Sequence, residues 1–383
     1  MDAKTQATYY LKLTPLSPIH IGSGREYFPQ EYIPQENPDR ILIVDLDQLI
    51  QKYPRIADQS FLAEQRTPLW ETRAGELVLR DASLVLNSDK TDRHTLQDIK
   101  ASAKRENVST IWEFTKTAYS RPYIPGSSVK GAVRTAIAYY LLATSPETFS
   151  RLKQVIVARN PRIEPGDGSA VEQLVFTDGN GAHDDLMRLW SFSDSSPLDC
   201  HKTLTVVQGR RLSSTQPLGF RNWYEALTET SGSLRLCATY DSALASCGAW
   251  RPVRPACFPK TIGDIFTCLN RFADDIIAHE LAYFRNHPAK PQETVDFYQN
   301  LKERRQRGEV LLCLGKGTGW HKKTIGQLLR QDRSSIFKDV VVAYRLGKGR
   351  RRFTDFPVSR EMAIRNRRPG VFGWAQMSME SRK

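Results

Sequence analysis

The chain has 383 residues, of which 55 are Lys or Arg and 42 are Asp or Glu, so its formal net charge is +13. With 40% apolar and 10% aromatic residues, the composition is that of a globular protein and excludes a disordered or low-complexity chain. The length allows two or three domains, and the basic surplus favours a polyanionic partner, nucleic acid before membrane.

Neither a membrane segment nor a metal site is predicted. The segment from Met1 to Lys12 lacks the apolar core of a signal peptide, and no stretch is long enough to span a bilayer, so we expect a cytoplasmic protein. The cysteines form no C-x-x-C pair, and their spacing does not match that of zinc ligands. We therefore expect free thiols, without a disulfide, bound metal or cofactor; the cysteines are Cys200, Cys237, Cys247, Cys257, Cys268 and Cys313.

The N-terminal region begins with a predicted strand and a small-residue loop. Tyr9 to Ile21 alternates in polarity, and its two prolines predict an edge strand or a bulge. Gly22-Ser23-Gly24-Arg25 follows as a loop that can approach another backbone closely and carries a cation. Tyr27 stands where a dinucleotide fingerprint would need its third glycine. His20 has the chemistry of a general base, but a packing or hydrogen-bonding role is the simpler interpretation.

Further elements are expected before the central helix. They are a strand at Ile41 to Leu46, a helix from Asp47 to Tyr53, a strand at Leu77 to Leu86, and a loop or helix from Asn87 to Asn107.

The central segment, Tyr123 to Leu142, is predicted to be an amphipathic helix. A Pro-Gly pair breaks the chain before it, and Ser127 and Ser128 are favourable N-cap residues. Lys130 and Arg134 lie four residues apart on one face near the first turn, where free amide groups and the helix dipole attract anions. We therefore predict a phosphate site at this helix start. The alternative is a capped core helix whose cations are merely solvated.

Mixed elements continue after this helix. They are a helix around Arg151 to Ala158, strands at Leu174 to Phe176, Leu186 to Ser193, Thr203 to Arg211 and Ser233 to Tyr240, and a long helix from Ile262 to Phe284.

A buried strand, Val310 to Leu314, then runs into a glycine-rich loop and a further helix through Leu329. This order is typical of phosphate cradles, although the spacing does not match a nucleotide P-loop. A flexible turn is the alternative interpretation. The residues through which this loop would bind are Gly315, Lys316, Gly317, Thr318, Gly319, Trp320, His321, Lys322 and Lys323, with Trp320 available to stack on a base.

The C-terminal segment is basic. Arg345 to Arg368 holds nine Lys or Arg residues against two acidic ones, and Gly349 to Phe353 is predicted to be a backbone-binding hairpin. A closing strand is expected from Gly370 to Met379. Because strands and helices mix without regular βα alternation, the predicted fold class is α+β with antiparallel sheets.

Several motifs resemble those of RAMP-superfamily CRISPR proteins. The opening strand and loop, Leu13 to Gly24, resemble the start of that family, and Tyr123 to Arg134 resembles the family's helix that meets guide RNA. Phe192 to Ser195 resembles its Ser-Asp-Ser turn, and Gly315 to His321 its late glycine-rich loop. Pro369 to Trp374 resembles the terminal motif of one subfamily, the Csm subunits that cap the 3′ end of CRISPR RNA (crRNA) in type III-A effector complexes.

The resemblance implies two ferredoxin-like domains, which we place at residues 1–200 and 201–383. It also implies a non-catalytic subunit that binds the 3′ portion of the guide and supports its maturation and complex assembly. The implied partners are crRNA, nearby target RNA, the backbone RAMP subunit, the small helical subunit and host nucleases. The RNA-binding residues we expect are Gly22, Ser23, Gly24, Arg25, Ser127, Ser128, Lys130, Arg134 and the residues from Gly315 to Lys323 given above.

Two alternatives remain open at this stage. One is a metal-independent RAMP endoribonuclease that processes precursor crRNA, with His20 or His321 as the base and Lys322 stabilising the transition-state charge. The other is the sister RAMP subunit that holds the 5′ handle of the guide.

Overall fold

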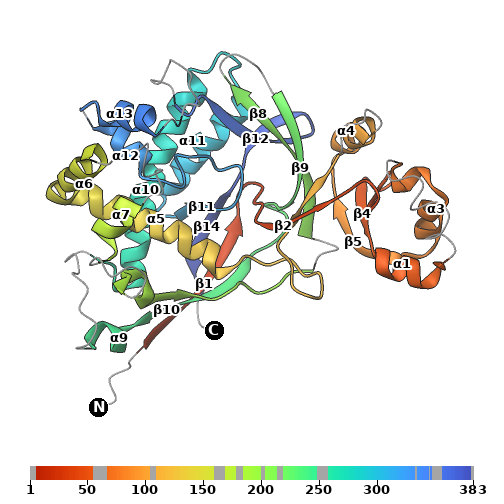
Figure 1. Cartoon of the computed structure of the whole chain (residues 1–383), viewed down its shortest axis with the longest axis horizontal. Helices are drawn as coiled ribbons and strands as arrows, with labels where there is room; N and C mark the ends of the chain where they lie inside the picture. The colour runs from red at the N-terminus through yellow and green to blue at the C-terminus, as the bar shows by residue number, and fades with distance from the viewer. Residues whose placement is uncertain are drawn as a thin grey trace.

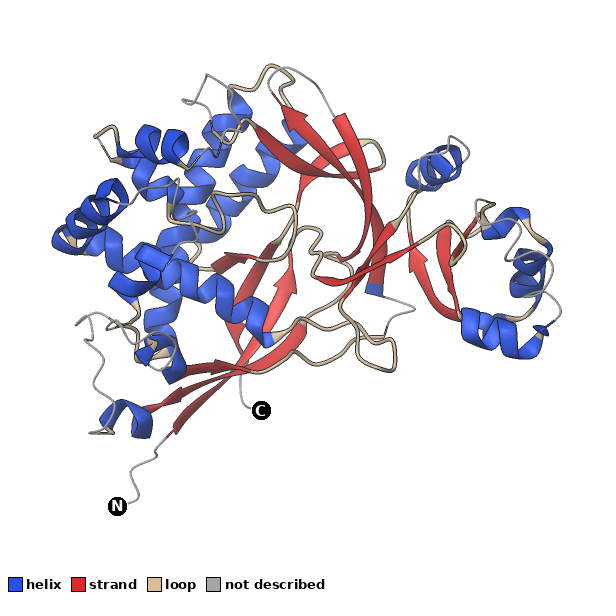
Figure 2. Ribbon diagram, viewed as in Figure 1, coloured by secondary structure: helices blue, strands red, loops and turns tan. Residues whose placement is uncertain are grey.

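The chain folds into two sheets and a group of helices, as the computed structural model shows (Figures 1 and 2). The structure describes residues 6–54, 67–103, 109–158, 169–177, 184–199, 203–213, 219–247, 258–332, 334–344, 346 and 356–380. Most helices gather on one side of the molecule, and the sheets run through its middle and into a small lobe at the opposite end, where the remaining helices lie. The predicted α+β class is confirmed.

The strands form one five-stranded and one nine-stranded sheet. The five-stranded sheet is antiparallel with the order β11-β14-β1-β10-β7, and the larger sheet follows β2-β6-β9-β8-β5-β4-β3, with β12 and β13 attached through β8. The strands are β1 Gln6–Pro15, β2 Gly22–Tyr27, β3 Tyr32–Gln35, β4 Arg40–Val44, β5 Val85–Lys90, β6 Ile111–Phe114, β7 Trp190–Phe192, β8 Leu204–Ser213, β9 Gly219–Leu227, β10 Leu234–Asp241, β11 Val310–Cys313, β12 Ser359–Arg365, β13 Arg368–Val371 and β14 Trp374–Met379.

The helices cover the five-stranded sheet and the end of the lobe (Figure 1). They are α1 Leu46–Lys52, α3 Arg73–Arg80, α4 Arg93–Ala103, α5 Gly126–Thr144, α6 Pro146–Ala158, α7 Ser169–Val175, α9 Ser242–Ser246, α10 Ile262–Arg285, α11 Gln292–Gln306, α12 Gly326–Gln331 and α13 Ile336–Ala343. The main core lies between this sheet and the apolar faces of α5 and α10, including Val133, Ile137, Leu269 and Ile276. Within the described part of the chain, no helix is long and apolar enough to cross a bilayer.

Four predicted elements take a different form in the structure, and one of them is the strand expected at Leu186 to Ser193, whose first four residues form a 3₁₀ helix. The strand expected at Leu77 to Leu86 begins as α3, because Thr72 caps that helix with a hydroxyl that accepts from the Gly75 amide at 3.2 Å. The strand expected at Leu174 to Phe176 overlaps α7. The loop expected at Gly22–Arg25 is the start of β2. In each case tertiary packing overrides a short local pattern.

Helix α5 begins one residue before the predicted caps. Its N-cap residue is Pro125, and neither Ser127 nor Ser128 caps it. Instead the Gly126 amide donates to Oδ1 of Asp194 at 2.8 Å, and the Ile124 amide donates to the Ser195 hydroxyl at 2.9 Å. The Ser-Asp-Ser turn therefore supplies the cap from a segment nearly seventy residues away in sequence.

The N- and C-terminal halves of the chain share the five-stranded sheet. Strand β1 lies between β10 and β14, with Leu11 opposite both Leu236 and Met379. The domain boundary near residue 200 stays a prediction. The predicted hairpin at Gly349–Phe353 lies outside the described residues, and the predicted closing strand is present as β13 and β14.

Substitution of two glycines of α5 should change stability in opposite directions. A methyl group at Gly126 would lie 2.1 Å from the Phe192 carbonyl oxygen, whereas a methyl group at Gly131 would meet no atom within 4 Å. Gly126→Ala should therefore destabilise the protein by about 1–3 kcal/mol, and Gly131→Ala should stabilise it by up to about 1 kcal/mol through helix propensity. Urea denaturation measures both. Equal effects of the two substitutions would contradict the close packing of the helix start.

Candidate nucleic-acid interface

Strand β2 presents an exposed backbone at the edge of the larger sheet. Among the described strands it pairs only with β6, and a bulge between Gly22 and Glu26 interrupts the pairing. Residues Gly22–Arg25 are exposed. Arg25 is bound to Glu31 at 2.5 Å, and the Ser23 hydroxyl donates to Glu113 at 2.7 Å. The strand therefore offers amide and carbonyl groups to a ligand from a fixed backbone.

The glycine-rich loop lies directly against the start of β2. The Lys316 amide donates to the His20 carbonyl at 2.8 Å, and a methyl group at Gly315 would lie 2.2 Å from that same oxygen. Gly315 also has a positive φ of 78°, so the contact requires glycine. The ammonium group of Lys316 lies 3.6 Å from the centre of the Trp112 ring on β6. Two segments that were predicted separately thus form one surface.

The start of α5 connects to the same surface through backbone hydrogen bonds. The Thr115 amide donates to the Ile21 carbonyl at 2.8 Å, and the Tyr123 amide donates to the Thr115 carbonyl at 3.2 Å. Pro125 and α5 follow directly. We call the surface formed by Gly22–Arg25, Gly315–Gly319 and the start of α5 the three-segment surface.

The two cations of α5 differ in their surroundings. Arg134 donates twice to Asp185, at 2.9 and 2.7 Å, and its guanidinium lies 4.1 Å from the centre of the Phe176 ring. Lys130 is half-buried, and this burial lowers the pKa of its ammonium group. No described residue forms an ion pair with Lys130 within 4.0 Å. Lys130 is therefore free to meet a phosphate, whereas Arg134 already serves to pack α5 against the turn before β7.

The second half of the glycine-rich loop is largely buried. Thr318, His321 and Lys322 are 3%, 2% and 6% exposed, whereas Gly319 and Lys323 are exposed. The half-buried Trp320 ring packs on the backbone of Gly326 and edge-on against two phenylalanines. The predicted helix does not follow the glycines directly, because the six-residue α12 starts only at Gly326. The exposed groups of this loop are therefore the backbone of Gly319 and Lys323, whereas Gly315 and Gly317 are half-buried.

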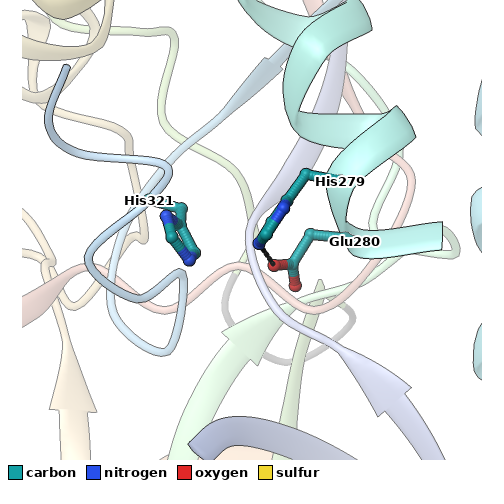
Figure 3. A group of neighbouring side chains, drawn as sticks. All are labelled: His279, Glu280 and His321. Carbon is teal, nitrogen blue, oxygen red and sulfur yellow. Dashed lines mark ion pairs between the residues drawn. The ribbon is translucent and has the colours of Figure 1, made fainter. Parts of the chain in front are cut away.

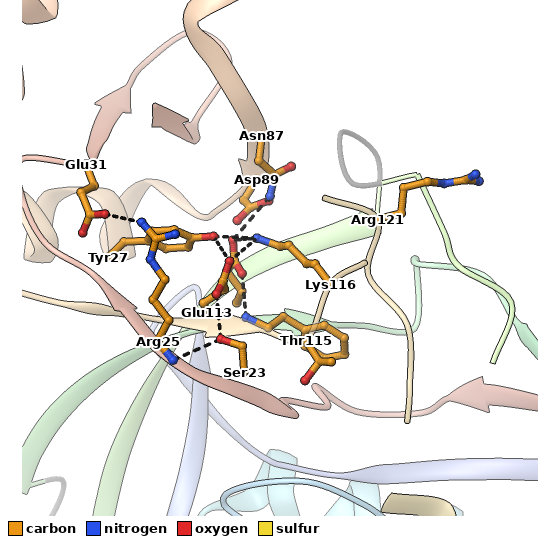
Figure 4. Close-up of polar contacts among 12 residues, drawn as sticks. Ser23, Arg25, Tyr27, Glu31, Asn87, Asp89, Glu113, Thr115, Lys116 and Arg121 are labelled. Carbon is orange, nitrogen blue, oxygen red and sulfur yellow. Dashed lines mark hydrogen bonds and ion pairs between the residues drawn. The ribbon is translucent and has the colours of Figure 1, made fainter. Parts of the chain in front are cut away.

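A buried polar network lies beneath β2 and β6 (Figure 4). The ammonium group of Lys116 donates to Oε1 of Glu225 at 2.7 Å, and the other carboxylate oxygen of Glu225 accepts from the Phe114 amide at 2.7 Å. Asn87 donates to Asp89 at 2.7 Å, and Asp89 and Glu225 are both fully buried. Burial, followed by the charge of Glu225, raises the pKa of Asp89 well above its usual range, so Asp89 holds its proton.

Both histidines that were considered as a base are buried. His20 is 1% exposed, and its Nδ1–H donates to the Glu225 carbonyl at 2.8 Å. Burial lowers the pKa of His20 to about 4 and lowers that of His321 further, so both rings are neutral near pH 7. Neither ring is exposed to accept a proton from RNA on the surface. Neither of the two histidines considered for the endoribonuclease interpretation is therefore positioned as a base.

One cluster of described side chains has the composition of a metal site. The ligand atoms of His279, Glu280 and His321 lie within 4.8 Å of one another (Figure 3). However, Arg360 donates to both carboxylate oxygens of Glu280 at 2.9 and 3.0 Å, and Lys322 lies 3.9 Å from it. These cations would repel a metal ion and already compensate the only acidic donor, so the cluster does not fit a metal.

Sequence reasoning missed the residues that hold the interface together. Glu225, Asp89 and Lys116 are far apart in the chain and belong to none of the motifs, so nothing in the sequence connected them. The sequence did draw attention to Asp194, because this residue belongs to the Phe192–Ser195 motif. Its capping role was visible only in three dimensions.

The buried carboxyl of Asp89 gives stability a specific pH dependence. The unfolded chain releases this proton near pH 4, whereas the folded chain retains it, so wild-type stability falls as pH rises, by up to about 1.4 kcal/mol per pH unit. Asp89→Asn removes the titration while it keeps an acceptor for Asn87. The variant should therefore gain stability relative to wild type between about pH 5 and 8, by an amount that grows with pH in urea denaturation. A difference that stays constant with pH would contradict the assignment.

Comparison with known proteins identifies the family of this chain. A RAMP superfamily model matches residues 12–362. The Streptococcus thermophilus protein named CRISPR system Cms protein Csm5 is 28% identical over 212 residues, which are 52% of this chain and 55% of that protein. The match thus spans about half the length of this curated relative.

Two solved structures share the fold. One is a chain of the cryo-EM structure of a Csm–crRNA–target RNA ternary complex of a type III-A CRISPR-Cas system, with a TM-score of 0.72, 23% identity, and coverage of 97% of this chain and 100% of that chain. The other is the crystal structure of T. onnurineus Csm5, with a TM-score of 0.64, 19% identity, and coverage of 95% and 99%. Because the family model spans most of the sequence, this chain belongs to the RAMP superfamily.

Proposed function

We propose that this chain is a crRNA-binding subunit of a type III-A Csm effector complex and that it caps the 3′ portion of the guide. The observation that carries the proposal is the three-segment surface, in which the edge strand β2 and the glycine-rich loop meet at His20 and the start of α5 follows a segment hydrogen-bonded to Ile21 through Thr115. The similarity to Csm5 from Streptococcus thermophilus supports the choice of subunit.

The chemistry of this surface suits a strand of arbitrary sequence. Its exposed groups are the backbone amides and carbonyls of Gly22–Arg25 and Gly319 and the ammonium group of Lys323, beside the half-buried backbone of Gly315 and Gly317 and the half-buried Lys130. Such groups contact phosphate and ribose and carry no base specificity. A guide whose spacer changes from one molecule to the next requires binding of this kind. The net charge of +13 adds long-range attraction for the RNA.

The proposed role is structural rather than catalytic. The buried positions of His20 and His321 support this, because a general base must reach the 2′-hydroxyl that it deprotonates. The proposed neighbours are the backbone RAMP subunit and the small helical subunit, with target RNA nearby and host nucleases trimming the guide end. These partners follow from the subunit assignment.

Removal of the two free cations should weaken guide binding without regard to sequence. Lys130→Ala combined with Lys323→Ala should lower affinity about equally for guides with unrelated spacers and reduce the slope of log affinity against log salt by about one to two. Lys302 is an exposed lysine on α11, and Lys302→Ala is the matched control that should change neither affinity nor salt slope. Arg134→Ala should instead lower the thermal stability of the protein, because it breaks the contact of Arg134 with Asp185. Fluorescence anisotropy over a salt series measures binding.

An unchanged salt slope in the double variant would contradict the phosphate assignment. The end of the guide is tested separately by crosslinking in the reconstituted complex with RNA labelled at one end. The proposal expects crosslinks to this chain from the 3′ portion. Crosslinks from the 5′ handle alone would identify the sister RAMP subunit instead.

A further inference from the structure

A tight turn between β6 and α5 projects a tyrosine into solvent. Tyr119 is 86% exposed, and the next most exposed large apolar side chain among the described residues, Leu79, is 52% exposed. An aromatic ring of this size contributes nothing to the core from such a position. Its exposure leaves the ring faces available to another molecule.

The turn that carries Tyr119 is held in one conformation. The Thr117 amide donates to the Arg121 carbonyl at 2.9 Å, and the Ser120 amide donates to the Thr117 carbonyl at 3.0 Å. The Thr117 hydroxyl accepts from the amides of Tyr119 and Arg121, both at 3.3 Å, and Ser120 has a positive φ of 57°. A preorganised turn loses little conformational entropy when its exposed ring binds.

The base of the turn is anchored in the buried network. Lys116 and Pro122 form an antiparallel bridge, and the side chain of Lys116 is 6% exposed and bound to Glu225 at 2.7 Å. Thr115, just before it, is bonded to Ile21 beside β2. The turn is therefore a rigid extension of the three-segment surface.

Arg121 supplies charge beside the ring. It is exposed, and none of the described residues forms an ion pair or a side-chain hydrogen bond with its guanidinium. Figure 4 shows Arg121 directed away from the network, on the far side of Lys116. An exposed aromatic ring two residues from an unpaired guanidinium matches a single-stranded nucleic acid, which offers a base to stack and a phosphate to pair. A single-stranded nucleic acid is favoured over a protein partner because the only apolar neighbour of Tyr119 in the turn is the small Ala118, and the other turn residues, Thr117, Ser120 and Arg121, are polar or charged.

We propose that Tyr119 stacks on one unpaired base of the guide strand and that Arg121 pairs with a phosphate of the same strand. This inference rests on the proposed function and adds a base-stacking residue to a surface that otherwise contacts the backbone alone. The stacked base marks the point where the strand leaves the three-segment surface. Because every base has a stacking face, the contact tolerates any spacer sequence.

The test uses the reconstituted complex with guides that carry 2-aminopurine at successive positions of the 3′ portion. Stacking on tyrosine quenches this base, so wild type should show one or two adjacent quenched positions. Tyr119→Ala should restore fluorescence there and weaken binding about five- to a hundredfold, whereas Tyr119→Trp should retain quenching. Arg121→Gln should weaken binding and reduce the salt slope by about one. Tyr10→Ala, an exposed tyrosine on β1, is the matched control.

The outcomes separate this inference from the proposed function. If wild type binds the guide but no quenched position depends on Tyr119, the stacking proposal is wrong while the RNA-binding role stands. If Tyr119→Ala releases a protein subunit from the complex and leaves the RNA signal unchanged, the turn is a protein contact and the proposal is likewise overturned. If wild type does not bind the guide at all, the proposed function itself fails. Unchanged thermal unfolding of Tyr119→Ala excludes misfolding as the cause of lost binding.

Discussion

The buried carboxylate of Glu225 organises the surface on which the proposed function depends. Its side chain binds the Phe114 amide of β6 and the ammonium group of Lys116, and its own carbonyl accepts from His20. The carbonyl of His20 in turn holds the glycine-rich loop through the Lys316 amide. Burial of a charge is costly, and a well-packed apolar residue would often be no less stabilising. The contribution of the carboxylate is structural order, because its hydrogen bonds fix the positions of β6, the Tyr119 turn and the β1–β2 connection relative to one another.

The glycines of the interface are explained by packing as much as by access for a ligand. Gly126 lies against the Phe192 carbonyl, and Gly315 against the His20 carbonyl, at distances that leave no room for a side chain. Each glycine thereby brings a backbone segment next to another backbone segment. The result is a surface made of main chain, held from beneath by buried side chains. Such a surface suits ribose and phosphate, which are the same in every guide.

Local sequence patterns predicted the helices and strands that carry a strong periodicity, and α10 begins at the predicted residue. The short apolar runs at Leu77–Leu86 and Leu174–Phe176 were assigned to strands because local periodicity cannot separate a short buried helix from a strand. The glycine and Pro-Gly motifs located the candidate surface. They did not show that Lys322 is buried or that Tyr119 is exposed, since burial depends on contacts between residues far apart in the chain.

Hydrogen–deuterium exchange of the assembled complex, with and without guide RNA, tests the central claim most directly. If one strand of RNA follows the three-segment surface, then Gly22–Arg25, Gly315–Gly319 and the start of α5 should all become protected when the guide is bound. The groove of about 940 Å³ between α11 and the β12–β13 turn provides the internal comparison and should be unaffected. Protection of that groove, with unchanged exchange in the three segments, would contradict the account.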